Sequence, residues 1–69
     1  MRHLRVVELA PEEVEALRLK NVLGLDQHTC AERMHTSQST FQRILHSAQC
    51  KASHALIKGM AISLGKTNE

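Results

Sequence analysis

The chain is short and poor in aromatic residues, and these two properties narrow the classes of protein to consider. It has 69 residues, a mass of 7.7 kDa, a net charge of +2, and one Phe with no Tyr or Trp. A single domain over residues 1–69 is expected, near the length at which a lone core needs very regular packing or a partner subunit. A large enzyme is excluded, and a single-strand binder that stacks bases on aromatic rings is disfavoured.

The basic residues are concentrated in the second half of the chain. Residues 1–32 have a formal charge of −2 and residues 33–69 a formal charge of +4. This asymmetry is typical of a surface that meets an anion such as nucleic acid, although solvated helix faces also produce it by chance.

The cysteines and the hydropathy indicate a reduced, cytoplasmic protein. Cys30 and Cys50 have no C-x-x-C spacing, and residues 1–5 lack the apolar stretch of a signal peptide. No window approaches the roughly 18 apolar residues that a membrane span requires. We therefore expect no membrane segment.

The predicted elements begin with a short strand over residues 4–9, where β-branched residues cluster without a helix cap. A helix then starts at Pro11 and stops at Gly24, because proline fits a first helical turn and glycine a helix end. Its acidic start is expected to be solvated and to compensate the helix dipole. The acidic residues are Glu12, Glu13 and Glu15, and the inward-facing positions are Val14, Leu17 and Val22.

A second, short helix is predicted from Asp26, a good N-cap, to about His35. Its core-facing side holds Cys30, Ala31 and Met34, and Cys30 is expected to behave as an inert apolar side chain. Ser37 is the natural N-cap of a third, longer helix that ends at Gly59. The apolar stripe of this helix comprises Phe41, Ile44, Leu45, Ala48, Ala52, Ala55 and Leu56.

The last predicted element is a strand over residues 60–64, followed by a flexible tail at 65–69. The two short strands at 4–9 and 60–64 can pack on the helices of their own chain or join a second copy. The second option predicts a homodimer and answers the problem of size. The expected fold is therefore mainly α, a three-helix domain with short flanking strands.

Residues 26–46 have the spacing of a helix-turn-helix motif, Gln27-x3-Ala31-x3-His35-x5-Phe41-x2-Ile44. Ala31 is small where two helices cross. His35 occupies the turn position that favours a left-handed backbone, which histidine adopts more readily than most non-glycine residues. Phe41 and Ile44 bury the inner face of the second helix, so that its outer face is free to enter a DNA major groove. Any small helical bundle can also produce such spacing.

The helix over residues 37–46 is predicted to read double-stranded DNA. Its outer face has no carboxylate, and Arg pairs with guanine and Gln with adenine in the major groove. The expected base-edge contacts are Gln38, Ser39, Gln42, Arg43 and His46, and the expected phosphate contacts are Ser37, Thr40 and Lys51.

The chain also resembles a known family on five segments, which cover most of residues 8–62. They are residues 13–19, Gly24-Leu25, residues 31–34, residues 37–48 and residues 55–59. The family consists of small prokaryotic proteins regarded as DNA-binding proteins of unknown function, with a helix-turn-helix similar to the promoter-reading C-terminal region of sigma factors. The resemblance implies sequence-specific DNA binding and transcriptional regulation. This chain departs from the family pattern at His28 and Thr29, where acidic residues are usual, and at His35, where glycine is usual.

Two alternatives remain open at this point. The first is a protein-interaction adaptor of the transcription machinery that uses the same exposed face. The second is a metal-responsive regulator, because His46, Cys50 and His54 stand four residues apart on one helix stripe. No constellation of catalytic side chains has a plausible pocket, so neither an enzyme, nor a cofactor, nor a small-molecule substrate is expected.

Overall fold

The computed structural model describes residues 5–65 and shows a mainly helical chain with two short strands. The elements in chain order are β1 (Val6–Leu9), α1 (Pro11–Leu17), the π-helical turn η1 (Arg18–Val22), α2 (Gln27–Arg33), α3 (Gln38–Lys58) and β2 (Ala61–Leu64). The predicted fold class is confirmed. The strands predicted at 4–9 and 60–64 are shorter than expected, and residue 4 and residues 66–69 of the predicted flexible tail lie outside the described part.

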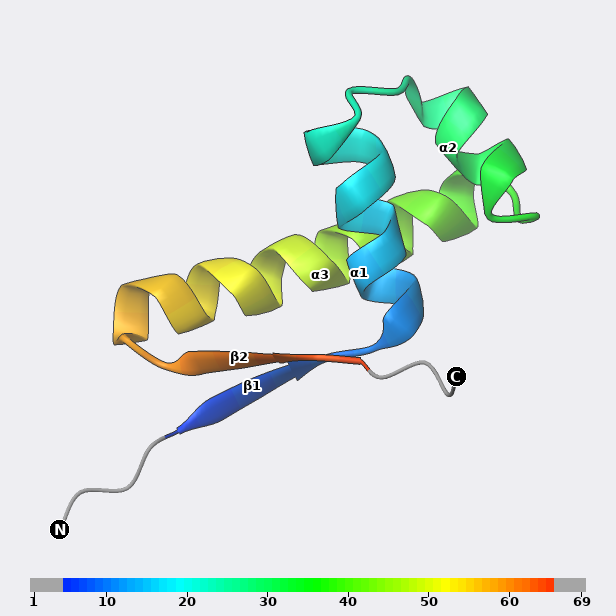
Figure 1. Cartoon of the computed structure of the whole chain (residues 1–69). Coiled ribbons are helices and arrows are strands. Elements are labelled where there is room, and N and C mark those ends of the chain that lie inside the picture. Colours follow the sequence, from blue (N-terminus) through cyan, green and yellow to red (C-terminus); the bar gives the residue numbers. More distant parts are fainter. Residues whose placement is uncertain (1–4, 66–69) are drawn as a thin grey trace, which may run out of the picture.

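Helix α3 is the element against which the others pack (Figure 1). Helices α1 and α2 lie over its N-terminal half, and the two strands run beside its C-terminal half. The core is centred on Phe41, which is fully buried. Its other buried members are Ala16, Leu19, Cys30 and Ala31, with Leu25, Met34, Ile44 and Leu45 packed against them. No helix within residues 5–65 combines the length and the apolar character needed to cross a membrane.

Strands β1 and β2 pair in parallel within the chain, with Val6 opposite Ala61 and Leu9 opposite Leu64. Parallel strands need a long crossover, and here the three-helix region supplies it. The second strand ends beside the start of α1, where only glycine fits. A Cβ on Gly65 would lie 2.5 Å from the Pro11 nitrogen and 2.7 Å from the Leu9 oxygen. The first of the two expected arrangements, in which the ribbon packs on its own helices, is therefore the one seen in the single chain.

The predicted N-caps of the second and third helices and the predicted end of the third are confirmed. The side chain of Asp26 accepts a hydrogen bond from the Thr29 amide, and that of Ser37 accepts one from the Thr40 amide. Helix α3 ends at Gly59, which has a left-handed backbone with φ of 67°. His35 also has positive φ, 57°, so the turn between α2 and α3 has the predicted conformation.

The first helix differs from the prediction in its last turn. The Leu23 amide donates to the Arg18 oxygen, five residues earlier, so residues 18–22 form a wider, π-helical turn. Because the π-helical turn contains one more residue than an α-helical turn, the next side chain to face the core comes one position later in the sequence. Leu19 is buried and Leu25 packs on the core, but Val22 is 76% exposed. The expectation that Val22 faces inward is therefore wrong.

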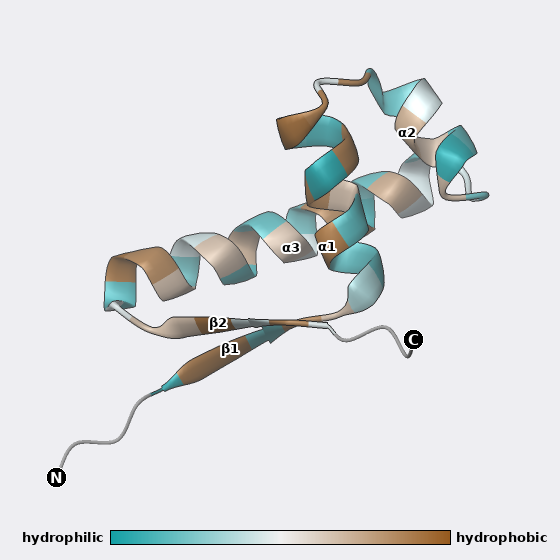
Figure 2. Cartoon of the chain, in the orientation of Figure 1, coloured by the Kyte–Doolittle hydropathy of each residue, from teal (hydrophilic) through white to brown (hydrophobic). Residues whose placement is uncertain are grey.

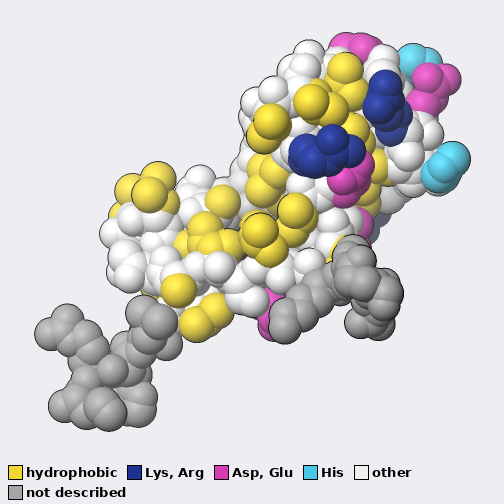
Figure 3. Space-filling view, viewed as in Figure 1, with side chains coloured by type: hydrophobic (Ala, Val, Ile, Leu, Met, Phe, Trp, Pro, Cys, Tyr) yellow, Lys and Arg dark blue, Asp and Glu magenta, His cyan; other side chains and the backbone are white. Residues whose placement is uncertain are grey.

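A second correction concerns the end of α3. Leu56 was placed on the apolar stripe, yet it is 79% exposed. Within the described residues, the thin two-stranded sheet is what lies beside this end of the helix (Figure 2), and Ala55 is buried there while Leu56 is not. Apolar side chains therefore remain open to solvent around the strands and the last turn of α3, as Figure 3 shows on one face. The large exposed ones in this region are Val6, Leu56, Ile57, Ile62 and Leu64.

Glu13 was expected to be a solvated side chain, but it is only 6% exposed and lies between α1 and α3. Its carboxylate accepts hydrogen bonds from the Ser47 hydroxyl at 2.6 Å and the Ala10 amide at 2.7 Å, and it pairs with the Lys51 ammonium at 3.1 Å. The Ser47 hydrogen bond, helped by Ala10 and Lys51 and opposed by burial, lowers the pKa of Glu13 below its ordinary value of 4.5. One carboxylate thus connects the start of α1 to the middle of α3.

Replacing Glu13 by Gln should lower the free energy of unfolding by about 1–3 kcal/mol at neutral pH, because three donors lose a charged acceptor. Since the folded pKa is lowered, this contribution is complete above the unfolded pKa and disappears as the pH falls through the folded pKa. Urea unfolding of both proteins from neutral to acid pH should therefore show a converging difference. The Glu12→Gln variant, changed at an exposed neighbour, is the control and should show a much smaller effect. A pH-independent difference would contradict the role of the charge.

Replacing His35 by Gly should raise the free energy of unfolding by up to about 1 kcal/mol. A left-handed backbone costs a non-glycine residue about 1–2 kcal/mol, and the flexibility of glycine in the unfolded chain offsets part of the gain. Thr36→Gly is the matched control in the same turn and should destabilise the protein, because its φ is not in the left-handed region. Thermal and urea unfolding measure both. Equal losses in the two variants would contradict the assignment of strain to His35.

Candidate nucleic-acid interface

The outer face of α3 brings together four of the predicted base contacts. Ser39, Gln42, Arg43 and His46 are all exposed on the side of the helix away from Phe41. They line one shallow, open depression, together with Gln27 from the start of α2. None of the described residues that line this depression carries a carboxylate, whereas Arg43 also borders a second depression that Glu12 and Glu13 line. Helix α3 therefore presents a cluster of hydrogen-bond donors and acceptors that includes a guanidinium and an imidazole.

Two of the predicted phosphate contacts, Ser37 and Thr40, lie at the N-terminus of α3. The Thr40 amide donates to the Ser37 Oγ at 3.2 Å, and the Ser37 hydroxyl donates to the Thr40 Oγ1 at 3.0 Å. These bonds make the two residues the cap of α3. An exposed helix N-terminus of this kind favours anions, because the helix dipole and the first amide groups point toward them.

Lys51, the third predicted phosphate contact, has a different place in the structure. It lies on the flank of α3 that faces α1, and its ammonium pairs with the buried Glu13 carboxylate. The side chain is 42% exposed and is engaged within the molecule. We therefore assign Lys51 to the internal ion pair rather than to the outer-face cluster.

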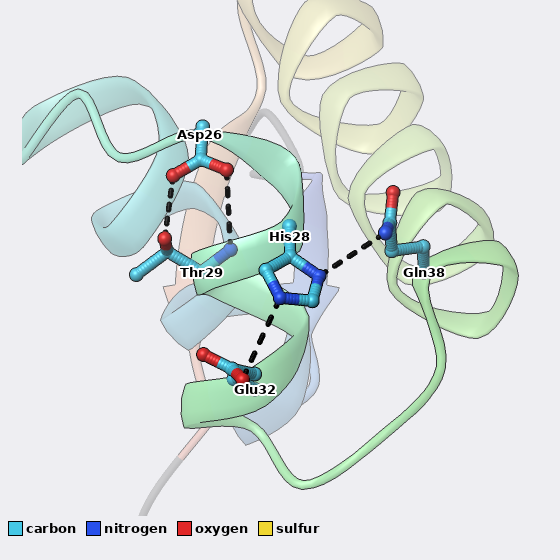
Figure 4. A network of polar contacts seen from close by, with 5 residues as sticks. All are labelled: Asp26, His28, Thr29, Glu32 and Gln38. Carbon is cyan, nitrogen blue, oxygen red and sulfur yellow. Dashed lines mark hydrogen bonds and ion pairs between the residues drawn. The ribbon is translucent and has the colours of Figure 1, made fainter.

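Gln38, the first residue of α3, belongs to a polar network that the sequence did not reveal (Figure 4). Its Nε2 lies 3.2 Å from the Nδ1 of His28, and the Nε2 of His28 lies 3.5 Å from the Oε2 of Glu32. The signal in the sequence is the spacing of four residues between His28 and Glu32, which places them on one face of α2. Their contact with Gln38 depends on how the turn folds α3 back beside α2.

The same view contains the cap of α2. The Thr29 hydroxyl donates to Asp26 Oδ1, and the Thr29 amide donates to Asp26 Oδ2 (Figure 4). The side-chain hydrogen bond from Thr29 lowers the pKa of Asp26 below its ordinary value. This carboxylate therefore stays charged at the start of α2, where the helix dipole stabilises it.

The metal-responsive alternative finds limited support in the geometry. The Sγ of Cys50 lies 3.4 Å from the Nε2 of His46. His54 lies one turn further along α3, and within residues 5–65 no three His, Cys, Asp or Glu side chains are grouped so that they could hold a metal ion. The predicted trio of His46, Cys50 and His54 is therefore not brought together as a three-ligand site.

Comparison with known proteins identifies the family of the chain. The family described as "Protein of unknown function DUF134" matches residues 2–68. The chain is 58% identical over 60 residues to a UPF0251 protein of Desulforudis audaxviator, covering 87% of this chain and 39% of that protein. It is 53% identical over 62 residues to a UPF0251 protein of Moorella thermoacetica, a match that covers 90% of this chain and 42% of that protein. It is 52% identical over 58 residues to one of Clostridium novyi, a match that covers 84% of this chain and 40% of that protein.

The chain thus spans about two fifths of the length of these relatives. No solved structure matches it. The match over residues 2–68 nevertheless covers nearly the whole sequence, including every element from β1 to β2. The chain is a member of the DUF134 family of UPF0251 proteins.

Proposed function

We propose that the protein binds double-stranded DNA sequence-specifically and regulates transcription, with residues 37–46 in the major groove. The observation that carries this proposal is the outer face of α3. There Ser39, Gln42, Arg43 and His46 are exposed and share one depression, whose described lining residues include no carboxylate. An α-helix with such a face fits the width of the major groove, and these residue types match its donor and acceptor pattern.

The packing of α3 supports the proposal. Phe41, on the opposite side of the same helical turns, is fully buried against α1 and α2. The Ser37 cap and the Glu13–Ser47 hydrogen bond fix the first half of the helix from its end and from its flank. A reading helix held in this way loses little conformational freedom on binding, which favours affinity.

Each residue of the outer face has a definite expected role. Arg43 can donate two hydrogen bonds to guanine O6 and N7, and Gln42 can pair with adenine N6 and N7. His46 and Ser39 lie beside them and offer one or two hydrogen bonds each to base edges. We expect Ser37 and Thr40, at the helix start, to position the helix on a phosphate without reading sequence.

The decisive experiment is selection of binding sites from a random duplex library with the purified protein. Enrichment of a defined motif is the expected result. A palindromic motif would support the predicted homodimer, whose contact surface we expect among the exposed apolar side chains near β2 and the end of α3. Failure to enrich any sequence over the input would contradict the proposal.

Salt dependence separates DNA binding from the adaptor function. A protein that neutralises several phosphates loses orders of magnitude in affinity between about 50 and about 200 mM salt, because counterions are released. We expect a steep dependence for this chain on a selected duplex. A flat response, with no duplex bound preferentially, would favour a protein partner on the same face.

Replacing Arg43 by Ala should weaken binding to a selected duplex by about 1–3 kcal/mol and relax the preference at one base pair. Arg18→Ala is the matched control, because Arg18 is an exposed arginine on η1 that pairs with Glu15 and lies outside the outer face of α3. Fluorescence anisotropy with the selected duplex and its single-base variants measures both. Unchanged affinity in the Arg43 variant would show that α3 does not read the groove as proposed.

A further inference from the structure

We propose that His28, held by Glu32, fixes the orientation of the Gln38 side-chain amide and thereby selects the base that Gln38 reads. This inference rests on the proposed function and makes it more specific. It concerns a positioning residue on α2, outside the outer face of α3, that controls a base contact at the first residue of α3.

The geometry forms a chain of three side chains from two helices (Figure 4). Glu32 Oε2 lies 3.5 Å from His28 Nε2, and His28 Nδ1 lies 3.2 Å from Gln38 Nε2. Glu32 is the charged group that contacts the imidazole, and α3 contributes the uncharged Gln38. Asp26, the other carboxylate in this view, is bonded to Thr29.

The neighbours of His28 favour one of its two neutral tautomers. An ionised carboxylate can only accept hydrogen bonds, so the neutral tautomer of His28 that suits Glu32, 3.5 Å away, has its proton on Nε2. The Nδ1 is then an acceptor, and the group it faces must be a donor. Gln38 therefore turns its NH₂ toward His28 and its carbonyl oxygen away, as drawn in Figure 4.

This orientation leaves two groups of Gln38 for a base. The outward carbonyl oxygen accepts, and the second hydrogen of the NH₂ donates. This pair is complementary to adenine, which presents the N6 donor beside the N7 acceptor in the major groove. With neutral His28, Gln38 should prefer adenine.

Protonation of His28 reverses the arrangement. Both ring nitrogens then donate, the ion pair with Glu32 strengthens, and the amide of Gln38 must present its oxygen to Nδ1. The NH₂ now faces outward with two donors, which match the two acceptors of guanine, O6 and N7. The preference at this single base pair should move from adenine toward guanine as the pH falls.

The test is library selection with the full chain at about pH 7.5 and about pH 5.5. At the higher pH, adenine should be preferred over guanine at one position on the order of tenfold, the ratio expected from one bidentate pair, and this ratio should collapse or invert at the lower pH. The His28→Gln variant should lose both the preference and its pH dependence. The His54→Gln variant makes the same chemical change at an exposed histidine near the end of α3 and should retain both.

Nitrogen NMR of the free protein provides a readout that needs no DNA. A protonated Nε2 and an accepting Nδ1 on His28, with Gln38 side-chain resonances that titrate together with the ring, are the expected results. The opposite tautomer of His28, or Gln38 resonances that do not change together with those of the ring, would contradict the proposed coupling between His28 and Gln38. In the selection, a motif without pH-dependent discrimination in the wild type would overturn this inference alone, whereas no motif at either pH would overturn the proposed function as well.

Discussion

The arrangement of this small domain depends on the hydrogen bonds and the ion pair that the carboxylate of Glu13 makes with its neighbours. Glu13 lies at the third position of α1, where it accepts a hydrogen bond from the amide of Ala10, the N-cap residue between β1 and α1. The same carboxylate holds Ser47 and Lys51 of α3. Because strand, first helix and long helix meet at one charged group, the rotation of α3 about its own axis is fixed. That rotation decides which residues of α3 face solvent.

The two halves of α3 differ in what they pack against and in what they expose. Over its first half, one side buries Phe41 and the other exposes the polar cluster around Arg43. Over its second half, it packs through small residues such as Ala55 on a thin sheet and leaves large apolar side chains uncovered. Phe41, the one Phe of a chain without Tyr or Trp, is buried beneath the polar cluster. Dense packing there holds the side chains of the cluster in a fixed arrangement for recognition.

Sequence patterns predicted the helix boundaries well, because boundaries depend on local chemistry. Asp26 and Ser37 cap helices through hydrogen bonds within one turn, and Gly59 ends a helix through its own backbone freedom. The left-handed His35 was predictable for the same reason. The outer face of α3 followed from periodicity once Phe41 was placed inside.

The features that sequence did not predict depend on contacts between elements. Val22 was misplaced because a constant period cannot anticipate a π-helical turn. Glu13 is buried because its partners lie on α3, 34 and 38 residues further along the chain. The pairing of His28 with Gln38 needed the angle between α2 and α3. The partners of Glu13 are distant in sequence, and the other two features depend on a departure from regular helix geometry and on the turn between α2 and α3, so hydrophobic periodicity alone does not predict them.

The parallel pairing of β1 and β2 has a kinetic consequence. The strands lie at opposite ends of the described chain, so their contact closes a loop that contains all the helices. Loop-closure entropy makes such a non-local contact slow to form until the intervening helices have shortened the loop. We therefore expect the helical region to fold first and the sheet to join it last. The ribbon, with its short strands and exposed apolar side chains, is then also the part of the fold that opens at the lowest cost.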